Sequence, residues 1–319
     1  LAADIVAGDT AARAGRKNII SNGSFQISQR GNYTSTTSAA NNTFYVDRFR
    51  TVAGSVNVSN QHTTVSIGGV SKRAYRVTAT SAATGYFGSR HGIELLDLEV
   101  GATYTISCWM RSNKSNARIR QDTIGATSAD STMSHTGGGD WEKITFTVDS
   151  TNTVANCALQ FICYPAAAVS VGDYIEIADV QMEVGSVATD FEHRSYGEEL
   201  RLCERYYQKL VGAYTQFSQI FNGHYNGTSQ IQGAYTYRTE MRTAPSLSYT
   251  STSSNNSSSA YAAAAGGAEV DFIDTLFLYN PSNLSTLIYT GTSTSGTAGH
   301  GANVYIQTTI TKLALVAEL

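Results

Sequence analysis

Charge is scarce in this sequence. Asp, Glu, Lys and Arg together make up 15% of its 319 residues, against about 25% in typical soluble proteins. The formal net charge of −3 provides no strong positive field, so we expect no nucleic-acid partner. An apolar run of about 18 residues is also absent, so we expect no membrane insertion.

Familiar catalytic motifs are missing as well. The sequence contains no G-x-S-x-G, H-E-x-x-H, P-loop or G-x-G-x-x-G motif. A glycosidase needs two carboxyl groups about 5–10 Å apart in a cleft, and several of the acidic residues fall in turns or helix caps. The sequence therefore predicts no catalytic residue and no enzyme.

The cysteines do not form a metal-binding pattern. There is no C-x-x-C pair and no histidine pair at zinc-finger spacing. We expect buried free thiols that pack as small apolar groups. The alternative is a disulfide bond from Cys108 to Cys157 or to Cys163.

Glycine, tyrosine, serine and threonine are abundant, and apolar residues alternate in many short runs. From Gly101 to Arg111, for example, Tyr104, Ile106, Cys108 and Met110 alternate with polar residues and Trp109. A period of two with glycine-containing turns is typical of half-buried strands. The sequence predicts an all-β protein built from sandwiches or barrels.

One segment has a helical pattern instead. Ser195 and Glu198 have the spacing of a capping box. Leu200, Cys203, Tyr207 and Leu210 follow on one helical face. We expect a short connecting helix within 195–210, from about Tyr196 to Lys209.

These patterns divide the chain into four parts. Residues 1–17 are expected to be a linker from a missing N-terminal part, and 18–194 a first β domain. After the connecting helix (195–210), residues 211–319 are expected to form a second β-sandwich, the tip domain. Two polar segments, 251–259 and 291–301, are predicted to be surface loops of this tip.

Several motifs together resemble the jelly-roll domain of bacteriophage tail fibres, which is itself similar to family 4/9 carbohydrate-binding modules. The matching segments are Asn18–Phe25, Tyr45–Phe49, Leu98–Trp109, Trp141–Thr147 and Ile177–Gly185. The most specific segment follows the sandwich, from Ala188 to Tyr207.

The resemblance implies a virion protein outside the cell, usually a homotrimer, that attaches to a host-cell surface glycan or receptor. Other virion proteins would contact it through the missing N-terminal part. A structural head fibre or capsid decoration protein without its own receptor is the alternative. A glycan depolymerase is less favoured, because no repeat of about 20–30 residues indicates a parallel β-helix.

The resemblance also implies a structural calcium near the first and last strands. Here the last strand offers Asp179, and the first offers only Asn22 and Ser24. One carboxylate makes a weak site for a cation that prefers about six to eight oxygens. We therefore expect no metal and no other cofactor.

Candidate ligand-binding residues are those that could stack on sugars or bind their hydroxyl groups. In the first domain they are Trp109, which faces away from the apolar row of its strand, and Tyr86, beside two glycines. In the tip domain they lie in or beside the polar loops: Tyr249, Asn255, Tyr261, Tyr289 and His300. The alternative is that Trp109 is covered by protein, that Tyr86 caps the sandwich, and that the loops have no partner.

Overall fold

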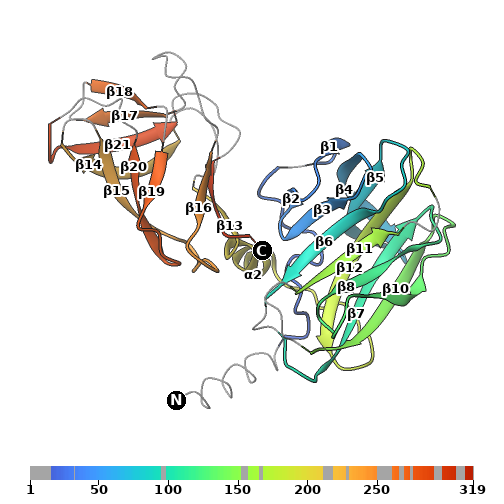
Figure 1. The fold of residues 1–319 in the computed structure, drawn as a ribbon. Helices are drawn as coiled ribbons and strands as arrows, with labels where there is room; N and C mark the ends of the chain where they lie inside the picture. The colour runs from blue at the N-terminus through green and yellow to red at the C-terminus, as the bar shows by residue number, and fades with distance from the viewer. Residues whose placement is uncertain are drawn as a thin grey trace. The chain divides into compact units, whose positions relative to one another are not determined.

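The computed structural model forms two compact units, the first ending at Leu200 and the second running from Arg201 to Glu318 (Figure 1). It describes residues 16–31, 33–94, 98–151, 157–164, 168–210, 218–227, 230–249, 261–265, 269–273, 276–290, 297–306 and 313–318. Strands dominate both units, which confirms the all-β prediction. Within these ranges no helix is long and apolar enough to cross a bilayer.

In its described residues, the first unit forms two antiparallel six-stranded sheets. In spatial order, the first sheet contains β1 (Thr37–Ala39), β4 (Val58–Ile67), β5 (Val70–Ala79), β12 (Tyr174–Val184), β7 (Thr103–Ser112) and β10 (Trp141–Asp149). The second sheet contains β2 (Phe44–Val46), β3 (Phe49–Ala53), β6 (Phe87–Ile93), β11 (Cys157–Cys163), β8 (Ala117–Asp122) and β9 (Ala129–Ser134).

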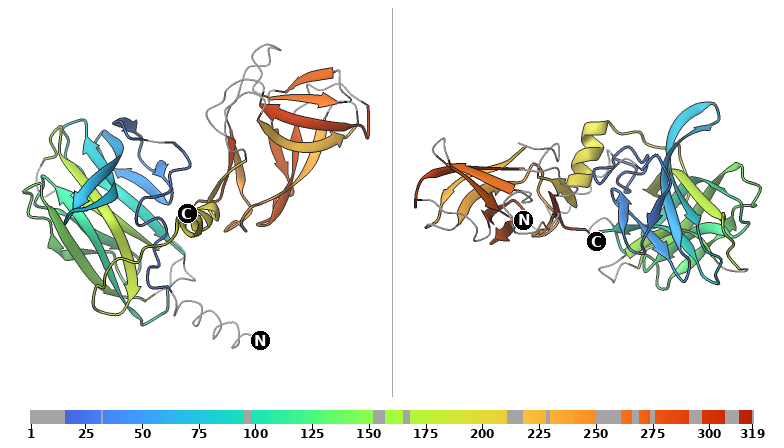
Figure 2. Two further views of the ribbon diagram at one scale, coloured as in Figure 1. Left: turned by 180° about the vertical axis from the view of Figure 1, so that it is seen from behind. Right: turned by 90° about the horizontal axis from the view of Figure 1, so that it is seen from above.

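The connections among β5 to β12 give this sandwich its jelly-roll winding. These eight strands split into the quartets β5-β12-β7-β10 and β6-β11-β8-β9, so that the chain passes back and forth between the sheets (Figure 2). The first and last of the eight, β5 and β12, are paired neighbours. Two four-stranded sheets wound in this way define a jelly roll, which confirms the predicted fold.

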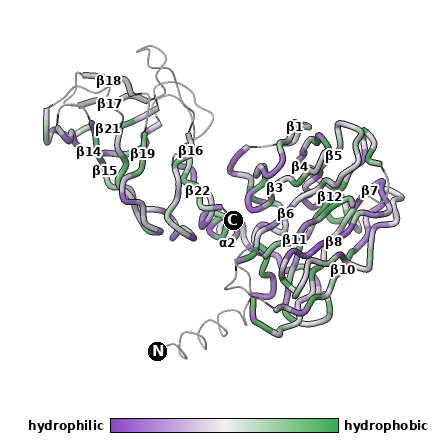
Figure 3. The backbone as a smooth tube through the Cα atoms, viewed as in Figure 1, coloured by the Kyte–Doolittle hydropathy of each residue, from purple (hydrophilic) through white to green (hydrophobic). Residues whose placement is uncertain are grey.

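The core lies between the two sheets and follows the predicted alternation. Hydrophobic and hydrophilic residues are interspersed along the strands of this unit (Figure 3). Strand β7 contributes Tyr104, Ile106, Cys108 and Met110, all buried, and Phe161 of β11 is fully buried in the same cluster. Each strand therefore has one side in the core and presents the intervening side chains on an outer face.

The cysteine side chains are buried and free. This confirms the first expectation and excludes the bridges from Cys108 to Cys157 or Cys163. Burial raises the pKa of the Cys163 thiol to about 12 and also raises that of Cys108. These groups therefore act as apolar packing residues.

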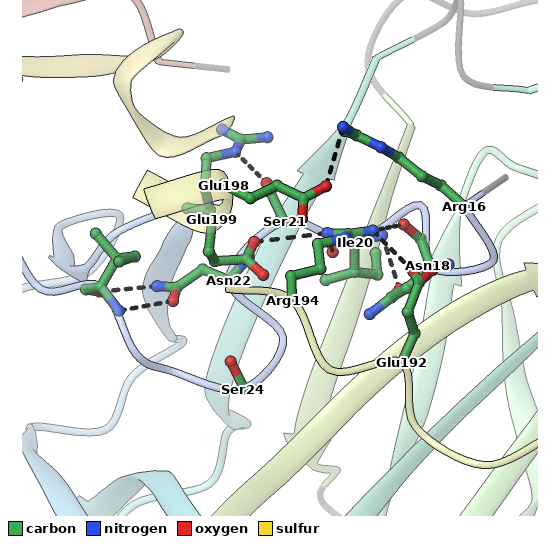
Figure 4. Close-up of polar contacts among 12 residues, drawn as sticks. Arg16, Asn18, Ile20, Ser21, Asn22, Ser24, Glu192, Arg194, Glu198 and Glu199 are labelled. Carbon is green, nitrogen blue, oxygen red and sulfur yellow. Dashed lines mark hydrogen bonds and ion pairs between the residues drawn. The ribbon is translucent and has the colours of Figure 1, made fainter. Parts of the chain in front are cut away.

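The segment after the sandwich ties the N-terminal segment to the first unit (Figure 4). Arg194 donates to the carbonyl oxygen of Ile20 at 3.0 Å and pairs with Glu199 at 3.5 Å. Glu199 is buried and accepts the backbone N–H of Asn22. Since these contacts join residues far apart in the chain, they close the first unit.

Helix α2 (Tyr196–Glu204) begins where the capping pattern places it, because Ser195 Oγ accepts the N–H of Glu198 at 3.3 Å. Its predicted end at Lys209 is wrong. Tyr207–Lys209 form strand β13, which pairs with β22. The buried Gln208 amide donates to the carbonyl oxygen of Glu204 at 3.1 Å and so closes the helix, and sheet pairing overrides the helical periodicity beyond it.

The second unit contains a three-stranded and a seven-stranded sheet in its described residues. The smaller sheet has the order β13, β22 (Leu313–Val316), β16 (Ser246–Tyr249). The larger has the order β18 (Glu269–Ile273), β17 (Tyr261–Ala265), β21 (Gly301–Ile306), β14 (Gln219–Tyr225), β15 (Ile231–Thr236), β20 (Ser285–Thr290), β19 (Leu276–Tyr279).

One core joins these two sheets. Leu313 and Leu315 of β22 belong to the same buried cluster as Ile220 of β14, Ile288 of β20 and Val304 of β21. The second unit is therefore also a layered β-structure. The predicted loop 251–259 lies outside the described residues, as does the first part of the loop 291–301.

Candidate functional site

The outer face of the first sheet carries both tryptophans of the sequence, and we call it the tryptophan face. Trp109 of β7 and Trp141 of β10 lie on it, opposite Lys143 and Arg111 respectively in the register of the two strands. As the alternation of β7 predicts, Trp109 does not join the row of Tyr104 in the core.

Other residues of the chain cover part of both tryptophan side chains. Trp109 and Trp141 are half-buried and belong to a small outer cluster with Ile67, Ala74 and Ala178. The Arg111 guanidinium lies 4.9 Å from the centroid of the Trp141 ring. The tryptophan face therefore has its own apolar packing, separate from the main core.

The outer face of the second sheet carries a pair of exposed tyrosines, and we call it the tyrosine face. Tyr86 directly precedes β6 and Tyr164 directly follows β11, at the end where Phe87 pairs with Cys163. Their rings stack with centroids 6.4 Å apart and planes 14° apart. They are 39% and 37% exposed, so the pair presents two nearly parallel aromatic rings that are partly open to solvent.

A row of polar side chains crosses the tyrosine face. Strand register places Arg50 of β3 opposite Arg90 of β6, and Arg90 opposite Gln160 of β11. Gln160 in turn lies opposite Arg120 of β8, which is paired with Asp130 of β9. The row therefore extends over five strands of a rigid sheet.

Ion pairs hold part of this row in place. Arg120 donates to Asp130 at 2.9 Å and lies 3.4 Å from an oxygen of Asp122. Arg90 lies 3.8 Å from the same Asp122, which also accepts the Gln160 amide. Burial alone would lower the pKa of the Arg120 guanidinium, but its hydrogen bond to Asp130 and the two aspartate charges raise it, so Arg120 is cationic.

The row and the tyrosine pair are connected. The Arg120 guanidinium lies 5.7 Å from the centroid of the Tyr164 ring, within cation–π range. Tyr86 lies against Gly54, where a Cβ atom would come within 3.4 Å of the ring. The tyrosine face thus combines ring surfaces with fixed hydrogen-bond donors and acceptors, the two elements needed to hold a polar ligand with apolar C–H patches.

The residues considered as calcium ligands bind other protein groups. The Asp179 carboxylate is paired with Lys72. The Asn22 side chain accepts the N–H of Ile27 and donates to backbone carbonyl oxygens, among them that of Asp47. Across the described ranges, no group of three or more His, Cys, Asp and Glu side chains could hold a metal ion.

The structure does not bring the sequence-predicted ligand residues of the first unit together. Tyr86 lies on the tyrosine face and Trp109 on the tryptophan face, and these belong to opposite sheets. The residues that share the tyrosine face with Tyr86 were not predicted, although the alternation of Arg118, Arg120 and Asp122 with Ile119 signals a charged outer row on β8.

The candidates of the second unit are scattered over different elements. Tyr289 of β20 is half-buried and contacts the rings of Phe277 and Tyr279 at 5.5 and 5.4 Å. His300 is exposed immediately before β21. Tyr249 ends β16 and Tyr261 begins β17, with side chains outside the described set, and Asn255 lies outside the described residues altogether.

The solved structures that resemble this chain include carbohydrate-binding modules with the jelly-roll fold, together with one phage tailspike domain. The chain is similar to TmCBM61 in complex with β-1,4-galactotriose, with a TM-score of 0.33 and 13% identity over 53% of this chain and 99% of that one. It is similar to the CBM22-1 xylan-binding domain from Paenibacillus barcinonensis Xyn10C, with a TM-score of 0.32 and 10% identity over 50% and 99% of the two chains.

The third of these structures is the enzymatically active domain of bacteriophage CBA120 tailspike protein 4. Its TM-score is 0.33, with 13% identity over 52% of this chain and 21% of that one. No protein-family description and no curated protein sequence matches the chain.

Proposed function

We propose that the first unit binds a glycan on the tyrosine face. The observation that carries this proposal is the exposed, nearly parallel pair of Tyr86 and Tyr164 beside the ordered row of Arg90, Gln160 and Arg120. Sugar rings present C–H surfaces that pack on aromatic rings and hydroxyl groups that bind amides and charged groups.

The rigidity of the platform supports this role. Every residue of the row stands on a strand, and the ion pairs with Asp122 and Asp130 fix the orientation of Arg120. Side chains that are already ordered lose less conformational entropy when a ligand binds. A preorganised sheet surface of this kind suits an extended saccharide.

We propose further that the protein is a non-catalytic virion fibre component that attaches to a host-cell surface. The tail-fibre-like motifs of the sequence support this role. Assembly into a homotrimer would present three copies of a weak site, and linked sites raise the overall affinity by about 10²–10⁴. Light scattering on the purified chain tests the trimer, and an assay for new reducing ends after incubation with bound polysaccharide tests the absence of catalysis.

The binding proposal is tested with a panel of neutral and acidic polysaccharides: galactan, xylan, dextran, polygalacturonate, hyaluronate and polysialic acid. Affinity electrophoresis identifies binders, and titration calorimetry with their oligosaccharides gives Kd. We expect the double variant Tyr86→Ala, Tyr164→Ala to lose at least about tenfold in affinity, since stacked aromatic contacts contribute upwards of 1 kcal/mol.

The matched control is Tyr196→Ala, which removes a tyrosine that is 59% exposed on α2, an element outside the sheet that carries the tyrosine face. It is expected to bind like the parent. Failure of the parent to bind any member of the panel, or full binding by the double variant, would overturn the proposed function.

A further inference from the structure

The seven-stranded sheet of the second unit carries three aromatic rings on its outer face. Leu276 and Leu278 of β19 pack into the core of this unit, so Phe277 and Tyr279 point outward, 38% and 49% exposed. Tyr289 of β20 is the register partner of Phe277, and the two rings stack with centroids 5.5 Å apart and planes 20° apart. The Tyr279 ring lies 5.4 Å from the same Tyr289 ring. Tyr289 therefore supports two rings that remain open to solvent.

Exposed aromatic rings are few in this chain, and they gather in groups. Among the described residues five aromatic side chains are exposed, and four of them are the tyrosine pair of the first unit and the pair formed by Phe277 and Tyr279. Exposed apolar groups that stand singly are ordinary, whereas contiguous ones mark interaction sites. The rings on β19 and β20 are therefore a candidate binding surface of the second unit.

A fixed polar pair continues the row of rings across the sheet. Gln232 of β15 is the register partner of Tyr289, and His224 of β14 is the register partner of Gln232. The Gln232 amide nitrogen lies 2.9 Å from His224 Nε2, so the amide donates and the neutral imidazole carries its proton on Nδ1. Neither side chain makes another hydrogen bond to the described part of the chain. Gln232 Oε1 and the Nδ1–H of His224 are thus available as an acceptor and a donor.

The face that carries this row is uncharged, and we call it the uncharged face. Strands β21, β14, β15, β20 and β19 contain no Asp, Glu, Lys or Arg. The tyrosine face, in contrast, is crossed by Arg90, Arg120 and Asp122. A charged ligand on the uncharged face would lose hydration without meeting an opposite charge. The composition of these strands therefore favours an uncharged ligand.

We propose that the uncharged face is a second saccharide site, specific for neutral glycans. A sugar ring offers an apolar C–H surface for Phe277 and Tyr279, and its hydroxyl groups both donate and accept, which matches Gln232 and His224. The row from β19 to β14 crosses three strand spacings, about 14 Å at about 4.8 Å each. A ligand that contacts the whole row is therefore an oligosaccharide. This site lies in a different unit from the tyrosine face and goes beyond the function proposed above.

The second site is expected to bind more weakly than the tyrosine face. Its donors and acceptors are neutral, and neutral hydrogen bonds are about half as strong as charge-assisted ones. The double variant Tyr86→Ala, Tyr164→Ala removes the stacking surface of the first site and leaves the second intact. Residual binding by this double variant therefore reports on the uncharged face.

The test measures binding of galactan, xylan and dextran to the full chain that carries Tyr86→Ala, Tyr164→Ala. We expect residual retardation by at least one of these neutral polysaccharides in affinity electrophoresis. Adding Phe277→Ala, Tyr279→Ala should lower the residual affinity at least about tenfold, since stacked aromatic contacts are lost. Adding Gln232→Ala instead should lower it about two- to tenfold, the effect of one neutral hydrogen bond.

Salt dependence gives a second readout. Binding to a face without charged groups should be the same at about 0.05 and about 0.5 M NaCl, because salt screens only interactions between charges. Residual binding that weakens markedly with salt would contradict the assignment to the uncharged face.

Leu284→Ala is the matched control. Leu284 directly precedes β20 and is 56% exposed, at the end of that strand away from Tyr289. Its truncation removes exposed apolar surface from the same unit without touching the row, and should leave residual binding unchanged. Thermal unfolding of each variant without ligand verifies that the fold is intact.

The outcomes separate this site from the function proposed above. If the parent binds no neutral polysaccharide, if Tyr86→Ala, Tyr164→Ala abolishes all neutral binding, or if residual binding survives Phe277→Ala, Tyr279→Ala, the second site is wrong and the tyrosine face is unaffected. If Tyr86→Ala, Tyr164→Ala binds like the parent and Phe277→Ala, Tyr279→Ala alone loses affinity, the tyrosine face fails and the second site stands. A smaller assembly of Phe277→Ala, Tyr279→Ala in light scattering, without ligand, would assign these rings to a contact between copies of the chain and overturn the second site.

Discussion

The two outer faces of the first unit belong to one sandwich and have opposite characters. The tryptophan face places its large aromatic rings against Ile67, Ala74 and Ala178, so its aromatic surface is used for packing. The tyrosine face leaves Tyr86 and Tyr164 open to solvent beside a row of charged groups. Aromatic content alone does not locate a binding surface, because what contacts the rings decides whether they are available.

The ion pairs on the two faces differ in the same way. On the tryptophan face Arg111 donates to Glu176 at 2.9 Å, and the Glu176 side chain is fully buried. On the tyrosine face Asp122 and Asp130 keep 16% and 25% of their side-chain surface exposed. A fully buried carboxylate depends on its partner far more than an exposed one.

The largest effect is therefore expected on the tryptophan face. Arg111→Leu removes the ion-pair partner of the buried Glu176 carboxylate, which keeps its hydrogen bond from Thr63, and should lower the free energy of unfolding by about 3–5 kcal/mol. Arg120→Leu, the counterpart on the tyrosine face, should cost about 0–1 kcal/mol. Urea denaturation measures the free energy of unfolding of both variants. Equal losses of unfolding free energy would contradict the expected difference between the two faces.

Truncation of one aromatic ring on each face gives the next largest contrast. Trp109→Ala opens a gap against Ala74 and Ala178 and should cost about 2–3 kcal/mol, below the about 3–5 kcal/mol typical of fully buried rings. Tyr164→Ala should cost less than about 1 kcal/mol, since much of that ring is already exposed. Melting temperatures that fall equally for the two variants would show that the tyrosine pair is structural.

Acid should lower the stability of the sandwich because of His91, a buried residue of β6. Burial, together with the charge of Arg48, lowers the pKa of His91 well below its ordinary value of 6.5. The unfolded chain then takes up a proton that the folded chain does not, so stability is complete above about pH 6.5 and falls as the pH decreases.

The expected loss from His91 is up to about 2 kcal/mol at pH 5. Denaturation at pH 7 and pH 5 measures it, with His91→Gln as the variant in which the pH-dependent loss should be smaller. An unchanged difference between the two pH values in His91→Gln would assign the acid sensitivity to other groups, such as His62, whose pKa is also lowered by burial.

Sequence periodicity was sufficient to predict the all-β fold and to predict which side of an individual strand faces the core. The alternation along β7 correctly separates Trp109 from Tyr104 and Ile106, because one side of each strand must enter the core. It did not give the end of α2, because the pairing of Tyr207 with Val316 is a contact between distant segments.

The tyrosine face was harder to predict for the same reason. Tyr86 was identified by its glycine neighbours, but Arg50, Gln160 and Arg120 are brought into one row on the same face only through the register of β3, β6, β11 and β8. The alternation in a single sequence predicts on which face of its strand each residue lies. It does not predict which strands lie next to each other in the sheet.

The central claim, that ligand binds the tyrosine face and leaves the tryptophan face untouched, has a direct spectroscopic test. Both tryptophans of the sequence lie on the tryptophan face, so selectively excited tryptophan fluorescence reports on that face alone. The tightest-binding saccharide of the panel is titrated while calorimetry follows saturation. We predict an unchanged tryptophan spectrum at full saturation, and the same affinity when the titration is repeated with the folded Trp109→Ala variant. A saturable shift or quenching with the calorimetric Kd, together with loss of binding in Trp109→Ala, would place the site on the tryptophan face and contradict the account.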